Sequence, residues 1–358
     1  MLTFVVRFLS ALCLFAFLAR ANLFLDVWSN TVLVLGYRAL LVLSPLLTRW
    51  GRSGAGGLCF ATAAGGTALW LVPSSPVRLA AALLVGFGLS VGGYVLKAGA
   101  AESAKGASYN KIALNCGSLL AGVYVALMAP SWGLVAFLVP PVVLLALCGP
   151  LSLRALRGAA STGGRRTGSP PAVRRHQVGW TLFGVAIGIK LFAVFAILPQ
   201  YLLSRGGALP SWYGWLVSLN AVVIIVCQRP VMGWITRRGT EAGRSRAVLS
   251  ALGCCMAVLA FPGWFHVEAL AGAVVWILLC TLAECAASYL DVAASRAGCL
   301  FPKEAAAGLG AGLCVALSRF AGTLGPELIG ALGLVCLLGG ALCLRATPPN
   351  TEAAPAAA

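Results

Sequence analysis

The chain has 358 residues, of which 60% are hydrophobic and only 10% charged, and its mean hydropathy is +0.94. A soluble domain carries about a quarter charged residues, so this composition excludes an ordinary water-soluble core and makes lipid the expected solvent. The net charge of +17 would suggest nucleic-acid binding in a soluble protein, but here we attribute it to cytoplasmic loops and expect no nucleic-acid partner.

Long apolar runs predict about twelve transmembrane α-helices, because a helix needs roughly 17–25 apolar residues to cross a bilayer. The runs do not alternate as the strands of a membrane barrel do. The first run lacks a small-residue cleavage site and is interpreted as a retained helix, not a signal peptide. Residues 306–344 barely fit two spans, which leaves eleven helices as an alternative. The predicted spans are roughly 2–19, 31–47, 56–73, 78–97, 111–129, 133–150, 178–199, 213–235, 246–264, 269–290, 306–323 and 327–344.

A polar, basic segment follows the sixth predicted span, at residues 151–177, and its composition is typical of a flexible loop. This linker separates an N-terminal bundle (1–150) from a C-terminal bundle (178–345), each of six helices. The tail, 346–358, has the composition of a disordered segment. The predicted fold class is therefore an all-α polytopic membrane protein with two pseudo-symmetric six-helix bundles.

Basic residues indicate the orientation, because Lys and Arg accumulate in cytoplasmic loops. With the N-terminus inside, the predicted external loops hold only three of the 26 basic residues: Arg20, Arg78 and Arg205. Most of the others, including Lys97, Lys111 and Lys303, fall in predicted cytoplasmic segments. We therefore expect both termini on the cytoplasmic side of the plasma (inner) membrane.

The sequence carries no motif for catalysis or for a cofactor. The 13 cysteines fall almost wholly in apolar runs, where they act as small hydrophobic residues, and no CxxC pair or His-rich cluster suggests a metal site. No phosphate-binding loop of the form GxxxxGK[ST] is present, which argues against ATP hydrolysis. We expect no enzyme activity, no cofactor and no metal.

A short motif recurs at the equivalent place in both predicted bundles. The turn after the second span reads Thr48-Arg49-Trp50-Gly51-Arg52, and the turn after the eighth reads Thr236-Arg237-Arg238-Gly239. Both contain T-R-x-G. Parallel repeats of six helices are how many transporters are built, with the substrate site at the interface between the repeats.

These turns and three other segments resemble the major facilitator superfamily of transporters, and its efflux members in particular, over nearly the whole chain. The other segments are Asn115-Cys116-Gly117, Leu198-Pro199-Gln200-Tyr201-Leu202 and Gly322-Thr323-Leu324-Gly325-Pro326. In that family the repeated loop carries an Asp that helps to hold the cytoplasmic face closed by charge pairing. Thr48 and Thr236 stand in its place here. The resemblance implies cytoplasmic gating loops in which such a contact is a neutral hydrogen bond.

Ionisable and polar residues within the predicted spans are the candidate site, because such groups are costly in lipid and usually face a partner or a cavity. Two interpretations stay open. In one, Glu284 forms a structural ion pair with Arg38 or Lys190. In the other, a central cavity of net positive character binds an anionic or zwitterionic solute, and Glu284 carries a proton. The candidate pathway residues are Arg38, Lys190, Asn220, Gln228, Glu284, Asp291 and Arg319.

We expect a monomeric secondary-active transporter of a small organic solute, an exporter driven by a proton gradient, in which two bundles rock about a central site. A transporter-like protein that signals or assembles partners without moving a solute is an alternative. A multispanning membrane transferase is a further one. It is disfavoured because His176 and His266 lie in loops and no acidic pair occurs at helical spacing.

Overall fold

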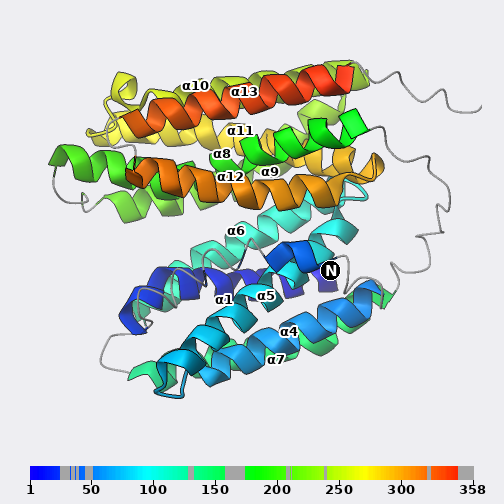
Figure 1. Ribbon diagram of the computed structural model, residues 1–358, viewed down its shortest axis with the longest axis vertical. Coiled ribbons are helices and arrows are strands. Elements are labelled where there is room, and N and C mark those ends of the chain that lie inside the picture. The colour runs from blue at the N-terminus through cyan, green and yellow to red at the C-terminus, as the bar shows by residue number, and fades with distance from the viewer. Residues whose placement is uncertain are drawn as a thin grey trace, which may run out of the picture.

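The computed structural model consists of α-helices arranged in two groups that lie side by side (Figure 1). The first half comprises α1 (Leu2–Phe24), η1 (Leu40–Leu43), α4 (Arg52–Leu69), α5 (Ser75–Ala100), α6 (Ala104–Leu127) and α7 (Gly133–Arg157). The second half comprises α8 (Arg174–Gly206), α9 (Tyr213–Arg237), α10 (Glu241–Ala260), η3 (Pro262–Phe265), α11 (Leu270–Arg296), α12 (Leu300–Phe320) and α13 (Gly325–Arg345). The structure describes residues 1–24, 33, 37, 40–44, 51–127, 133–157, 174–206, 210, 212–237, 240–320 and 324–345.

Each predicted span overlaps a described helix, with boundaries that differ by up to about seven residues, apart from 31–47, which lies mostly outside the described residues. Seven described helices are long and apolar enough to cross a membrane, or eight if α8, bent by 43°, counts as one span. Both α12 and α13 are among them. They are separate helices of 21 residues each, which decides against the eleven-helix alternative. The predicted span 306–323 begins six residues after the start of α12, because Lys303 and Glu304 have the polarity of loop residues.

Each half has its own apolar core. Phe60 and Trp70 are fully buried in the first half, and Trp276 is fully buried in the second. Between the halves, α6 packs against α9 and α11. Helices α5, α7, α9 and α11 finish, and α6, α8, α10 and α12 begin, at one end of the molecule, on the right in Figure 1. We call this the linker end.

A tight turn joins α11 to α12 at the linker end. Gly298 in this turn has a φ of 67°, a left-handed conformation that glycine adopts without the steric cost other residues meet. The peptide N–H of Cys299 donates to the carbonyl of Ala294 (2.8 Å), which satisfies one of the final carbonyl groups of α11. The turn therefore places the last turns of α11 beside the first turn of α12.

Small residues set the distance between α8 and α12, which make the most extensive contact among the described helices. A Cβ atom added at Gly184 would lie 2.2 Å from the carbonyl oxygen of Lys303, and one at Gly188 would lie 2.0 Å from that of Ala307. A Cβ at Gly310 of α12 would lie 2.1 Å from the carbonyl oxygen of Val185. Close backbone approach at small residues is a common way for helices to associate in lipid.

We expect Gly188→Ala to destabilise the protein by about 1–3 kcal/mol, because the new methyl group must push α12 away from α8. The measurement is the thermal unfolding of the purified protein in detergent. Gly312→Ala is the control on α12, since a Cβ there meets nothing within 4 Å. Equal melting temperatures for the two variants would contradict this packing.

Candidate functional site

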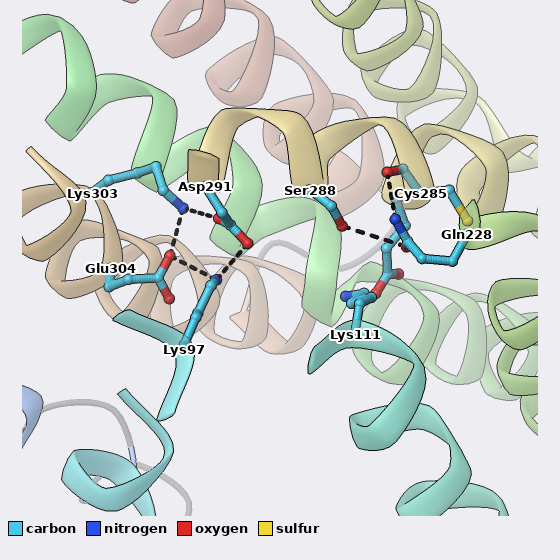
Figure 2. Close-up of polar contacts among 9 residues, drawn as sticks. Lys97, Lys111, Gln228, Cys285, Ser288, Asp291, Lys303 and Glu304 are labelled. Carbon is cyan, nitrogen blue, oxygen red and sulfur yellow. Dashed lines mark hydrogen bonds and ion pairs between the residues drawn. The ribbon is translucent and has the colours of Figure 1, made fainter. Parts of the chain in front are cut away.

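One face of α11 carries four of the polar residues of this mostly apolar helix. Thr281, Glu284, Ser288 and Asp291 are spaced by three, four and three residues, which places them along one side of the helix. The carbonyl of Cys285 is also used on this side, as an acceptor for Gln228 (Figure 2). Each of these side chains has a described partner, and the partners come from both halves of the molecule.

Glu284 is held between two lysines from opposite halves. One carboxylate oxygen contacts the ammonium group of Lys111 on α6, and the other contacts that of Lys190 on α8. The Lys190 side chain is only 1% exposed, and Lys111 and Glu284 are also largely buried. In a low-dielectric interior such contacts are strong, but each charge depends on its partners for compensation.

The ion pair between Glu284 and Lys190 is one of the two pairs considered from the sequence, and Lys111 was missed. The sequence interpretation counted Lys111 among loop charges because it started the fifth span at residue 111. That start was too late, because α6 begins at Ala104 and Lys111 lies two turns inside it. The sequence offers no signal that separates Lys111 from a loop lysine. In the structure the amide of Asn115, one turn further along α6, donates to the Lys111 carbonyl (2.9 Å).

A second cluster of charges lies at the linker end, about 10 Å along α11 from Glu284, since Asp291 follows it by seven residues. Lys97 of α5 donates to Glu304 (2.8 Å) and pairs with Asp291 (3.1 Å). Lys303, fully buried at the start of α12, donates to Asp291 (2.6 Å) and also to Glu304. Figure 2 shows Lys97 reaching from its own helix to these two carboxylates. We call these four residues the linker-end network.

The sequence predicts Asp291 as a pathway residue but not the other three residues of the network, because Lys97 and Lys303 fall in predicted loops and Glu304 is not among the candidates. The turn at Gly298 brings Asp291 next to Lys303 and Glu304, and the contact between the halves brings Lys97 to them. An aromatic contact joins the halves close by, since the rings of Tyr94 and Phe301 meet edge to face at 6.0 Å.

The predicted amide residues connect α9 to α11 within the second half. The hydroxyl of Thr281 donates to the Asn220 side-chain oxygen (2.7 Å). The hydroxyl oxygen also lies 2.6 Å from the carbonyl oxygen of Ile277 in the same helix. Gln228, fully buried, donates to the Cys285 carbonyl (3.3 Å) and accepts from the Ser288 hydroxyl (3.4 Å) (Figure 2). Buried amides of this kind position α9 against α11.

Several predicted residues lie outside the described parts of the chain. They are Arg38, Thr48, Arg49 and Gly239. Arg319 belongs to α12, but its side chain is outside what the structure describes.

Of the predicted gating residues that are described, none bridges the two halves through a contact that the structure describes. Gly51 precedes α4 with a φ of 90°, and Arg52 donates to the exposed carboxylate of Glu102 (2.9 Å) within the first half. The hydroxyl of Thr236 bonds the carbonyl groups of Met232 (2.9 Å) and Gly233 (3.1 Å) in its own helix, and Arg237 is the last residue of α9. Among described residues, ion pairs across the two halves are made by Lys97 and Lys111 instead.

The arrangement of helices matches solved transporter structures over nearly the whole chain. The human organic anion transporter MFSD10 (TETRAN) aligns with a TM-score of 0.65 at 15% identity, covering 95% of this chain and 98% of that one. The proton:xylose symporter XylE, of the major facilitator superfamily, aligns with a TM-score of 0.64 at 14% identity, covering 94% of each chain. A bacterial homologue of the iron transporter ferroportin, in an outward-facing state, aligns with a TM-score of 0.66 at 15% identity, covering 96% and 98%.

No protein-family model matches the sequence, and no curated protein does. The structural likeness nevertheless defines the class of fold. The chain is an all-α, multi-pass membrane protein with the fold of the major facilitator superfamily, as its sequence predicted. Each of these solved structures is named for transport or as a homologue of a transporter.

Proposed function

We propose that this chain is a secondary-active transporter that exports a small anionic or zwitterionic organic solute, driven by a proton gradient. The observation that carries the proposal is the position of Glu284, buried between a lysine of each half. Alternating access requires contacts between the halves that form in one state and break in the other. The pair of Lys111 with Glu284 and the pairs of Lys97 with Asp291 and Glu304 fit this requirement.

Glu284 also supports coupling to protons. Its negative charge balances one of the two lysines, so adding a proton would leave two cations facing each other with no anion between them. Repulsion between Lys111 and Lys190 would then favour separation of the halves, since like charges at short range repel strongly in a low-dielectric interior. A carboxylate that joins the halves connects a proton gradient to the conformational change if it takes up a proton during transport.

The class of solute follows from the sign of the charges. Two cations, Lys111 and Lys190, contact the single carboxylate of Glu284, whereas the linker-end network contains two cations and two carboxylates. A path with positive character favours anions over lipophilic cations. One structural neighbour is named as an organic anion transporter and another as a proton-coupled symporter, which agrees with this proposal. The export direction rests on the resemblance of the sequence segments to efflux members.

The test is solute flux in proteoliposomes containing the purified protein, with and without an imposed pH gradient. Organic anions are expected to move faster when the gradient is present, and Lys190→Met is expected to lower the flux while folded protein remains in the membrane. Lys105→Met, on an exposed side chain of α6, is the control. Transport of cationic dyes with no movement of anions would contradict the class of solute. Folded protein without any flux would favour the alternative of a protein that signals or assembles partners.

A further inference from the structure

The charges that join the two halves are distributed one-sidedly. In the described part of the chain, each ion pair between the halves joins a lysine of the first half, Lys97 or Lys111, to a carboxylate of the second. The first half is poor in carboxylates, since residues 1–157 contain only Asp26 and Glu102, and Glu102 pairs with Arg52. Figure 2 shows Lys97 and Lys111 reaching from their own helices toward α11 and α12.

Each of these carboxylates also has a lysine in its own half. Glu284 keeps Lys190, and Asp291 and Glu304 keep Lys303, whatever the position of the first half. If the halves separate at the linker end, the second half therefore retains compensated charges. Lys97 and Lys111 lose the partners that the structure shows for them.

The two lysines differ in how easily water can replace those partners. The two side chains are about equally exposed, Lys97 at 18% and Lys111 at 15%, but Lys97 lies three residues before the end of α5, close to the linker end. Lys111 lies two turns inside α6, about 10 Å of helix from its start. An ammonium group at that depth without a counter-charge is costly, so the separated state needs an anion at Lys111.

We propose that Lys111 binds the carboxylate of an organic monoanion in place of Glu284 when the halves separate, so that this exchange of partners couples solute binding to opening at the linker end. The inference rests on the proposed transport function and adds the binding residue and the charge of the solute. One lysine balances one negative charge, and a dianion would leave an uncompensated charge among apolar helices.

The two partners of Glu284 have opposite effects on opening under this proposal. Lys111→Met removes an attraction between the halves and leaves Glu284 with Lys190, so the linker end opens more easily. Lys190→Met leaves Lys111 as the sole described counter-charge of Glu284, so separation becomes harder. If both lysines had only a structural role, both substitutions would loosen the protein.

Amide hydrogen exchange of the purified, full-length protein measures this opening at the linker ends of α5 and α12, where Tyr94 and Phe301 meet. We expect faster exchange there in Lys111→Met, slower exchange in Lys190→Met, and no change in the exposed control Lys105→Met. Exchange that becomes faster in both Lys111→Met and Lys190→Met would overturn the proposal.

Benzoate and its neutral isostere benzamide test the anion directly at constant ionic strength. Benzoate is expected to speed exchange at the linker end of the unmodified protein, and benzamide to have no effect. Lys111→Met should weaken the apparent affinity for benzoate about tenfold or more, because a charge-assisted contact is lost. The proposal fails if benzoate has no effect, if benzamide acts equally, or if Lys111→Met responds as the unmodified protein does. If Lys111→Met does not accumulate in the membrane, two measurements still test the proposal. They are the comparison of benzoate with benzamide in the unmodified protein and the direction of the change in hydrogen exchange in Lys190→Met.

Flux separates this inference from the proposed function. Normal anion transport by Lys111→Met in proteoliposomes would overturn the inference and leave the transporter intact. If hydrogen exchange changes as expected but no solute flux is measured, the transport function is contradicted and the anion site at Lys111 is retained.

Discussion

Glu284→Gln is expected to lower the free energy of unfolding by about 3–5 kcal/mol, because it leaves two buried lysines without the carboxylate that both contact. The Lys190 side chain is almost completely buried, so water cannot replace the lost partner. The measurement is the apparent melting temperature of the purified protein in detergent, compared with that of the unmodified chain. Transport should be lost as well, since the contact that joins the halves at this depth is gone.

The exposed pair of Arg52 and Glu102 provides the control for this prediction. Glu102→Gln removes a carboxylate from an ion pair at the surface, where such pairs contribute about 0–1 kcal/mol. Adding Lys190→Met and Lys111→Met to Glu284→Gln removes all three charges and should recover much of the stability. Two results would contradict the assignment of Glu284 as the carboxylate that balances the two buried lysines. One is an equal melting temperature for Glu284→Gln and Glu102→Gln, and the other is a lower melting temperature for the triple variant than for Glu284→Gln.

Lys303→Met is expected to destabilise the protein about as strongly, by roughly 3–5 kcal/mol, because it removes a fully buried cation that bridges Asp291 and Glu304. The two carboxylates would then share Lys97 alone, although they lie close together and repel. Thermal unfolding measures the loss. A decrease of less than about 1 kcal/mol, the range of a surface ion pair, would show that Lys303 is not needed to balance the network.

Lys97→Met is the matched variant, since it removes the other lysine of the same network. Lys303 still bridges both carboxylates in this variant, and Lys97 lies close to the linker end. We therefore expect a small change in melting temperature with faster hydrogen exchange at the linker end. Equal loss of stability in Lys97→Met and Lys303→Met would contradict the division of roles between an intra-half bridge and an inter-half contact.

The polar face of α11 illustrates how far sequence reasoning reaches. Glu284 and Asp291 were predicted as site residues because a carboxylate in an apolar run is costly in lipid. The spacing of Thr281, Glu284, Ser288 and Asp291 could have predicted a continuous polar face. Lys111 could not be placed there, because the start of its helix lies among residues whose polarity resembles that of a loop. Hydropathy scores a lysine in the same way whether it faces water or a buried carboxylate.

Hydropathy and helix length are local properties, so they are enough to predict a lipid-embedded, all-helical chain and most of its helices. The transporter fold was predicted from the resemblance of short motifs to a known family. Which charges meet could be learned from the folded chain alone. Lys97 and Glu304 are 207 positions apart, and Lys190 and Glu284 are 94 apart. Which lysine reaches which carboxylate depends on how two helical bundles dock, and the energy of each pair depends on the burial that the docking creates.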